Sequence, residues 1–265
     1  MAKLSEDKFD VATALLRGNG LWSNLGYWTE AQSYDEAAAA LARLVGKAAG
    51  LEPGQDVLDL ACGYGGSVRL WLDDFLVKSV DAIDIRRDCI ESLKRAEIVG
   101  LRHAITGEVS DSLDLQFSPS YNAIVSVDAA YHFADAWILA RLATRYLRSG
   151  GRLAYTTLVK ADIDALKTSA GTRGFMKAAS IPEAAVPTSA ELTSRLADLG
   201  FNKISVEFMT KEVCLGFADF VGLVSDSLTL TQRLTPAWWK IVLTAKACRR
   251  LEAWGLSYAL ISCEK

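Results

Sequence analysis

The sequence lacks several features that would assign it to a common class. It has no run of basic residues, and its net charge of −3 argues against nucleic acid as the main partner. Its five cysteines form no Cys-x-x-Cys pair, which argues against structural zinc and predicts no bound metal. No apolar run reaches the roughly 18 residues of a membrane span, and the charged first residues do not resemble a signal peptide. We therefore expect a cytoplasmic protein with reduced cysteines.

What is present is a large apolar content without internal repeats or low-complexity tracts. Hydrophobic residues make up 51% of the 265 residues, which is enough for a full core. The length fits one large α/β domain that carries insertions. The expected regions are 1–50 (a helical cap), 51–160 (an α/β core), 161–200 (a lid segment and helix) and 201–265 (the last two strands, with a helical lid insertion at 214–255).

The chain is organised around residues 56–67, which read Asp-Val-Leu-Asp-Leu-Ala-Cys-Gly-Tyr-Gly-Gly-Ser. The apolar run from Val57 to Ala61 predicts a buried parallel strand, and the glycines behind it predict a tight turn. Residues 67–75 then have the apolar spacing of a helix. The amide groups in the first turn of such a helix are free to bind an anionic or polar ligand. The pattern predicts a nucleotide-type turn in an α/β domain.

The order of residues in this stretch differs from the dinucleotide fingerprint. Val68 stands where the third glycine of Gly-x-Gly-x-x-Gly belongs, and the order from Asp59 is Asp-x-x-Cys-Gly-x-Gly-Gly. This order resembles the first motif of the class I S-adenosylmethionine-dependent methyltransferases, in their small-molecule (ubiquinone, sterol and natural-product type) branch. The resemblance implies a Rossmann-like, doubly wound, seven-stranded sheet with the last strand antiparallel and with helical lid insertions. It also implies the cofactor S-adenosyl-L-methionine and the product S-adenosyl-L-homocysteine. A glycine turn in an unrelated α/β protein is the alternative.

An acidic residue, Asp84, falls at the end of the second predicted strand, residues 79–85. A carboxylate there can accept hydrogen bonds from both ribose hydroxyls of an adenosine ligand. An NAD-dependent enzyme would place an acid at the same point, so Asp84 indicates an adenosine ligand without separating the two classes. A cap on the following helix is the other role open to this residue.

The resemblance extends the expected cofactor site to further residues. Asp111 and Ser112 precede Leu115-Gln116-Phe117, in the place where the family carries an acid and a small residue ahead of Leu-Pro-Phe. This pair would face the adenine amino group, with Asp114 as an alternative. The expected cofactor-binding residues are Asp59, Ala61, Gly63, Gly65, Asp84, Ile85, Asp111, Ser112 and Val127.

The fourth predicted strand, residues 121–128, is followed by Ala-Ala-Tyr-His-Phe. Ligands bind at the carboxyl ends of the strands in open α/β sheets, so we expect this end to face the reacting methyl group. His132 has a suitable pKa to take a proton from a hydroxyl or amine acceptor, and Tyr131 is expected to orient that acceptor. His132 is structural instead if its hydrogen bonds hold the loop, because methyl transfer often needs no base.

Aromatic residues ahead of the core predict a cap over the site. Leu25-Gly26-Tyr27-Trp28 resembles a segment that covers cofactor and substrate in small-molecule methyltransferases. We expect Tyr27 to join Tyr131 and His132 as a catalytic residue. The expected walls of the substrate site are Tyr27, Trp28, Tyr131 and Trp238. The alternative is that the tryptophans of this segment only anchor it on the core.

Two irregular stretches, residues 160–187 and 214–255, are expected to cover the open side of the site. Their side chains predict a small, largely apolar substrate from secondary metabolism, and a dimer interface is the competing use of the second stretch. The predicted function is S-adenosylmethionine-dependent methyl transfer (EC 2.1.1.-), with oxygen slightly favoured over nitrogen or carbon as acceptor. An NAD-type oxidoreductase and a non-catalytic cofactor-binding protein are the alternatives. Either a monomer or a homodimer is expected.

Overall fold

The computed structural model describes residues 13–115, 120–160 and 170–265. The helix expected at the N-terminus lies largely outside these residues, which begin with a short 3₁₀ turn at Thr13–Leu16. Gln116 and Phe117 and part of the expected covering stretch after Lys160 also lie outside them. The sheet and the cavity described below are built from the described residues.

Seven strands form one mixed sheet in the order β3-β2-β1-β4-β5-β7-β6. The strands are β1 (Asp56–Leu60), β2 (Ser79–Asp84), β3 (Leu101–Thr106), β4 (Tyr121–Ser126), β5 (Leu147–Lys160), β6 (Asn202–Phe208) and β7 (Leu256–Glu264). β1 to β5 pair in parallel, whereas β7 runs antiparallel to both β5 and β6. The predicted doubly wound sheet with an antiparallel last strand is confirmed.

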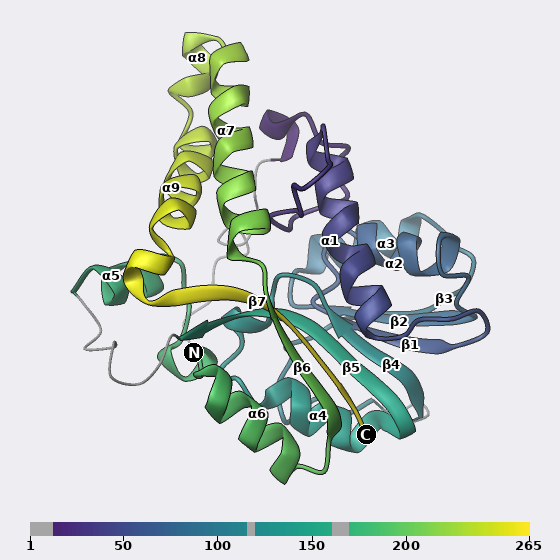
Figure 1. Ribbon diagram of the computed structural model, residues 1–265. Helices are drawn as coiled ribbons and strands as arrows, with labels where there is room; N and C mark the ends of the chain where they lie inside the picture. The colour runs from purple at the N-terminus through teal and green to yellow at the C-terminus, as the bar shows by residue number, and fades with distance from the viewer. Residues whose placement is uncertain (1–12, 116–119, 161–169) are drawn as a thin grey trace.

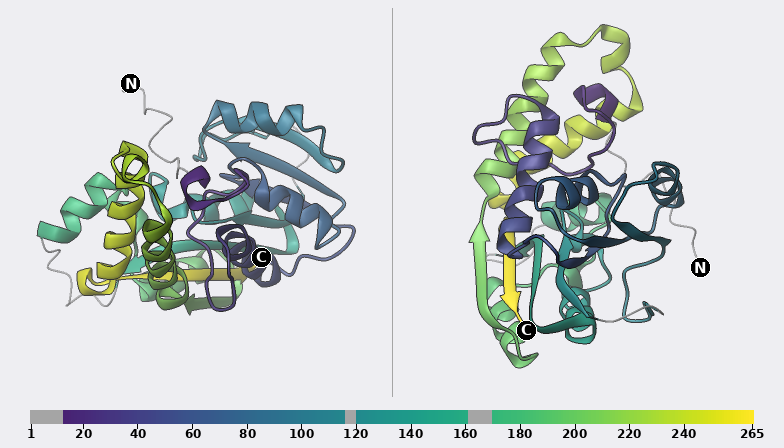
Figure 2. Two further views of the ribbon diagram at one scale, coloured as in Figure 1. Left: turned by 90° about the horizontal axis from the view of Figure 1, so that it is seen from above. Right: turned by 90° about the vertical axis from the view of Figure 1, so that its right-hand side faces the viewer.

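Helices cover both faces of this sheet (Figure 1). α1 (Tyr34–Ala48), α2 (Gly66–Asp73) and α3 (Arg87–Arg95) lie on one face, and α4 (Ile138–Tyr146) and α6 (Ser189–Asp198) lie on the other. The remaining helices are α5 (Ala170–Ala178), α7 (Gly216–Ser227), α8 (Leu230–Arg233) and α9 (Pro236–Arg250). Figures 1 and 2 show α7 and α9 standing out from the sheet as a helical pair.

The central strands are buried on both faces because their apolar side chains point alternately to the two helical layers. Every residue of β2 is buried, and so are all but the first residue of β1. Val57 packs with the layer that contains α1 and α2, whereas Leu58 and Leu60 pack with the layer that contains α4. A parallel sheet that is covered on both sides needs such near-continuous apolar strands.

Local signals fix where several elements begin. Thr188 accepts a hydrogen bond from the Glu191 amide, and the Glu191 carboxylate accepts one from the Thr188 amide, so a capping box starts α6. The apolar pattern predicts a third strand over residues 104–109, and these bounds are wrong. β3 begins directly after Gly100, whose φ of +90 turns the chain into the sheet earlier than the apolar pattern suggests.

α7, α8 and α9 form the predicted insertion. Thr235 caps α9 and Pro236 occupies its first turn, so the insertion divides at this pair of residues. Large apolar side chains remain exposed along it, at Leu223, Leu230, Leu234, Trp239 and Leu243. None of the described helices combines the length and the apolar content needed to cross a membrane. The expectation of a dimer interface on this insertion stays a prediction.

Candidate active site

One large cavity opens at the carboxyl ends of β1, β2 and β4 and extends to α5 and α9. Its volume is about 1230 Å³, above the roughly 300–1,000 Å³ of most small-molecule sites. Its walls come from the segment before α1, from the loops after these three strands, and from the two covering helices. A cavity of this size has room for a cofactor and a second molecule together.

The loop after β1 forms one wall because its glycines adopt left-handed backbone torsion angles. φ is +58 at Gly63 and +86 at Gly65, a region that favours glycine. A Cβ atom on Gly65 would overlap the side chain of Leu93 in α3, so close packing also requires glycine here. Ala61 and Gly63 line the cavity, whereas Gly65 packs on α3 as the N-cap of α2, and the expected cofactor contacts of all three stay predictions.

The Asp59 side chain lies in the core beneath this loop. Its Oδ2 accepts hydrogen bonds from the Ser67 hydroxyl (2.7 Å) and the Trp71 indole (2.8 Å), both in α2. Burial raises the pKa of Asp59 to about 6, and the two donors only partly oppose this shift. Asp59 therefore ties α2 to the end of β1, and its expected contact with the cofactor stays a prediction.

Asp84 lines the cavity at the end of β2 and is itself buried. Its Oδ2 accepts a hydrogen bond from the Gly63 amide (2.7 Å), and its Oδ1 accepts bonds from the Arg86 amide (2.9 Å) and Nε (3.2 Å). The Arg86 guanidinium is also buried and lies 5.4 Å from the centre of the Tyr64 ring. The sequence analysis missed Arg86, because a second arginine follows at once and nothing in the pattern marks either as buried.

The surroundings of Asp84 fit the adenosine half of S-adenosylmethionine. A carboxylate accepts about four hydrogen bonds, and the three donors on Asp84 leave capacity for a ribose hydroxyl. Ile85 and Val109 line the same cavity and offer apolar surface for a flat base, and Val127 lines it at the loop after β4. Ile85 and Val127 were among the predicted cofactor residues, and Val109 was not.

The structure does not bring Asp111 and Ser112 to this cavity. The Asp111 carboxylate accepts two hydrogen bonds from Arg141, both of 2.6 Å, and it is exposed to solvent. The Ser112 hydroxyl is also exposed and lies 2.9 Å from the Ser110 hydroxyl. Glu108 and Val109, at the start of the same loop, line the cavity instead. The adenine contact expected at Asp111 and Ser112 stays a prediction, and Glu108 is a competing candidate.

The loop after β4 places a half-buried carboxylate, Asp128, in the wall of the cavity. Asp128 Oδ1 accepts hydrogen bonds from the hydroxyls of Tyr131 and Tyr258, both of 2.7 Å. Its Oδ2 accepts one from the Leu25 amide in the segment before α1 (2.7 Å). Burial raises the pKa of Asp128 to about 6, and these three donors act against the rise. The sequence analysis missed Asp128, because two of its partners lie far away along the chain.

His132 lines the cavity next to Tyr131, as predicted, and the two ring centres are 4.5 Å apart. His132 Nδ1 lies 3.4 Å from the Ser180 carbonyl oxygen, which can only accept a hydrogen bond. Burial lowers the pKa of His132 to about 4, so the imidazole is uncharged at neutral pH. Its expected role as a base stays a prediction, although a group with this pKa holds a proton weakly.

The other predicted aromatic walls pack elsewhere. Trp28 stacks on Phe220 with ring centres 4.3 Å apart, and its indole donates a hydrogen bond to the Leu25 carbonyl. Trp238 is buried in the core, and the half-buried Tyr27 packs against the same core. Large aromatic side chains bury much apolar area wherever they pack, and these three pack against the protein core and not in the cavity. The described aromatic residues that do line the cavity are Trp22, Tyr131, Phe133, Phe175, Phe217, Trp254 and Tyr258.

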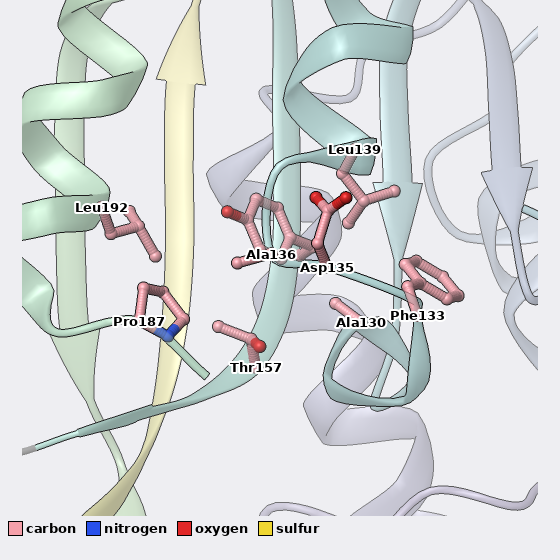
Figure 3. Close-up of a pocket in the computed structure, with 9 residues that line it drawn as sticks. Ala130, Phe133, Asp135, Ala136, Leu139, Thr157, Pro187 and Leu192 are labelled. Carbon is pink, nitrogen blue, oxygen red and sulfur yellow. The ribbon is translucent and has the colours of Figure 1, made fainter. Parts of the chain in front are cut away.

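A second hollow lies on the other side of β5, beside α4 and α6 (Figure 3). It encloses no room for a ligand, and its one acid, Asp135, is paired with Arg141 at 2.9 Å. Within the described ranges no cluster of histidine, cysteine or carboxylate side chains is arranged to hold a metal ion. The large cavity is therefore the candidate active site.

Comparison with known proteins identifies the family of the chain. A family model described as mycolic acid cyclopropane synthetase matches residues 15–214, more than half of the chain. The erythromycin 3''-O-methyltransferase of Saccharopolyspora erythraea is 26% identical over 147 residues, which are 54% of this chain and 48% of that protein. The 27-O-demethylrifamycin SV methyltransferase of Amycolatopsis mediterranei is 30% identical over 135 residues, 49% of this chain and 48% of that protein. The chain spans about half the length of these curated relatives.

Among solved structures, the cyclopropane synthase MmaA2 from Mycobacterium tuberculosis has a TM-score of 0.74 at 18% identity, over 98% of this chain and 94% of that chain. At this identity the likeness concerns the fold. The family match includes the glycine loop, Asp84 and the loop after β4. The chain belongs to the mycolic acid cyclopropane synthetase family of class I S-adenosylmethionine-dependent methyltransferases, as its first motif predicted, and its cofactor is S-adenosylmethionine.

Proposed function

We propose that this protein transfers a methyl group from S-adenosylmethionine to a hydroxyl group of a small, largely apolar metabolite. The observation that carries the proposal is one continuous cavity, which joins the acid at the end of β2 to an apolar chamber under α9. Oxygen is favoured as acceptor because two relatives are named for O-methylation.

The cofactor end of the cavity is assigned to the loops after β1 and β2. Gly63 would hold the methionine part, Asp84 the ribose and Ile85 the base. The Arg86 Nε is the most distant donor on Asp84, at 3.2 Å, and a ribose hydroxyl can replace it. When bound, S-adenosylmethionine supplies an electrophilic methyl group on a positively charged sulfur.

The acceptor end is assigned to the chamber between α5 and α9. Its apolar surface comes from Phe175, Ile181, Phe217, Ile241, Leu251 and Trp254. Such a wall favours an apolar body and keeps water from the reacting methyl group. Methyl transfer is an in-line displacement, so most of the chain's contribution is to hold the acceptor oxygen at attack distance.

The loop after β4 supplies the polar groups at the reacting end. Tyr131 and His132 both line the cavity there. A hydroxyl acceptor must lose its proton as the new bond forms, and a well-placed proton acceptor contributes about 10²–10⁴-fold to the rate. We assign the removal of this proton to the groups on this loop.

The proposal is tested in two steps. Isothermal titration calorimetry should show binding of S-adenosylhomocysteine and no binding of NAD. Methyl-labelled S-adenosylmethionine is then incubated with the protein and a panel of hydroxylated apolar metabolites, which includes 27-O-demethylrifamycin SV. A labelled methyl ether, located by NMR, is the expected product. Binding of NAD alone would indicate the oxidoreductase alternative, and binding of S-adenosylhomocysteine with no labelled product would indicate the non-catalytic one.

A further inference from the structure

The backbone of Asp128 has an unfavourable conformation that a hydrogen bond to a neighbouring strand holds in place. Its φ is +58, in the left-handed region that costs energy for a residue with a side chain. Its backbone amide donates a hydrogen bond to the Thr156 hydroxyl in β5 (2.7 Å), which holds this conformation. Strained backbone that is held in this way is common at functional sites. In this conformation the Asp128 side chain forms part of the wall of the candidate active site.

The carboxylate is linked to the cavity by a phenol. The Tyr131 hydroxyl donates its hydrogen bond to Asp128 Oδ1 (2.7 Å), so its oxygen lone pairs are left to accept a bond from another group. Tyr131 and Val127 both line the cavity, on the loop after β4. A hydroxyl acceptor in the chamber can therefore donate to Tyr131 while Tyr131 donates to Asp128.

The groups that face this pair carry no positive charge in the described part of the chain. Asp128 is met by the hydroxyls of Tyr131 and Tyr258 and by the Leu25 amide. The thiols of Cys214 and Cys248 face the same pair from the covering segments. The described groups that contact Asp128 are thus all uncharged donors, and no fixed cation neutralises its carboxylate.

We propose that Asp128 accepts, through the Tyr131 hydroxyl, the proton that the methyl acceptor loses, an inference that rests on the proposed O-methyl transfer. Tyr131 takes the proton from the acceptor hydroxyl and passes its own proton to Asp128 Oδ1 in one concerted step. The acceptor oxygen uses the freed electron pair to form the C–O bond, and the pair of the broken C–S bond stays on sulfur. The products are the methyl ether, a neutral thioether and a protonated Asp128.

Charge changes in the cavity favour this route. Before transfer the cavity holds a positive sulfonium and a negative carboxylate, and after transfer both are neutral. Separated charges are costly where water is excluded, so the neutralisation helps the reaction. A free tyrosinate is not required, which is consistent with a pKa of Tyr131 that burial raises well above its usual value.

Variants separate this route from one through His132. Asp128→Asn keeps the shape of the side chain, and Tyr131→Phe keeps the ring but removes the relay. With the acceptor found in the panel, each should lower kcat about 100-fold or more and leave the affinity for S-adenosylhomocysteine within about threefold. The double variant should be no slower than the single ones, because the two groups act as a unit. Tyr155→Phe is the control, a buried tyrosine outside the cavity whose loss should not change kcat.

The pH dependence of kcat/KM provides a readout that a structural role would not change. If Asp128 is the acceptor, kcat/KM should fall below a pH of about 6, whereas His132 as acceptor would place the fall near 4. Removal of a donor from the carboxylate destabilises its charged form, so Tyr258→Phe should move the fall to higher pH. Carbon-13 NMR of the labelled aspartate carboxyls should show the same midpoint, in a signal that Asp128→Asn removes.

The outcomes are distinguishable. Turnover by the wild-type protein with unchanged rates in Asp128→Asn and Tyr131→Phe would overturn the relay and leave the proposed function intact. A rate lost only in His132→Ala, with a fall of kcat/KM near pH 4, would do the same. If Asp128→Asn does not fold, Tyr131→Phe carries the test alone. Binding of S-adenosylhomocysteine without a methylated product would overturn the proposed function, and the relay with it.

Discussion

Replacement of Asp84 by alanine should lower the affinity for S-adenosylhomocysteine by about 100-fold or more. Asp84 lies at the end of β2 against the cavity, where we assign it to both hydroxyls of the ribose. Each hydrogen bond to a charged acceptor contributes about 1.5–3 kcal/mol, so the loss of two amounts to about 3 kcal/mol at least. Each 1.4 kcal/mol corresponds to about tenfold in affinity. Asp84→Asn, which keeps one accepting oxygen, should lose about tenfold.

The same substitutions also affect folding, and the assay must separate the two effects. Asp84→Ala removes the carboxylate that pairs with the buried Arg86 guanidinium and with the Gly63 amide. Loss of one member of a buried ion pair costs up to about 3–5 kcal/mol of unfolding free energy. Affinity should therefore be measured by calorimetry well below the melting temperature of each variant, which differential scanning calorimetry supplies.

Asp88→Asn is the matched control. It removes one negative charge from the same segment, but Asp88 is exposed and its carboxylate accepts a hydrogen bond from the Tyr64 hydroxyl. Its affinity for S-adenosylhomocysteine should stay within about twofold of wild type. Equal losses of affinity in Asp84→Asn and Asp88→Asn would show that the affinity depends on the net charge of this segment and not on a contact with Asp84. Unchanged affinity in a folded Asp84→Ala protein would refute the assignment of the ribose to Asp84.

Three further predictions concern the walls of the cavity and the core beneath it. Gly65→Ala should cost more unfolding free energy than Gly54→Ala in urea titrations, because both glycines have positive φ but only Gly65 has a side chain of α3 in the way. Glu108→Gln should weaken S-adenosylhomocysteine binding more than Asp111→Asn, because Glu108 lines the cavity and Asp111 does not; the opposite order in calorimetry would support the sequence-based assignment. The pKa of Asp59 is raised from 3.8 to about 6, so its contribution to stability is present below pH 3.8 and is lost as the pH rises through 6. In the wild type, ionisation of Asp59 should lower the unfolding free energy by up to about 3 kcal/mol between pH 4 and 6, and Asp59→Asn should remove this contribution. Urea unfolding that gives the same pH dependence for both proteins would count against the burial argument.

The sequence predicted the parts of this site that depend on local pattern. The strand from Val57 to Ala61, the glycine turn and the acid at Asp84 follow from apolar runs and from the torsion angles that only glycine adopts freely. The strand, the turn and α2 follow one another directly, so the strand–turn–helix unit fixes their relation in space. Asp84 joins them because β2 pairs with β1 in parallel, which brings the ends of both strands to the same edge of the sheet. The same logic placed Tyr131 and His132 at the end of β4.

The parts that the sequence did not predict depend on contacts between distant residues. Asp128 becomes notable only because β7 brings Tyr258 to it, 130 residues further along the chain. Asp111 matches the family motif by position, but Arg141 in α4 holds its carboxylate at the surface. Trp28 belongs to an aromatic segment that could cover a ligand, and Phe220 in α7 provides the surface that buries it instead. The spacing of residues along the chain does not show which distant side chain each of these residues will contact.

The central claim is that one cavity holds the cofactor at Asp84 and presents the acceptor to the loop after β4. A crystal structure of the protein with S-adenosylhomocysteine tests it most directly. The account predicts ribose oxygens within hydrogen-bond distance of the Asp84 carboxylate and the cofactor sulfur at the end of the cavity lined by Val127 and Tyr131. A ribose bound away from Asp84, or a sulfur that points away from Tyr131, would contradict it.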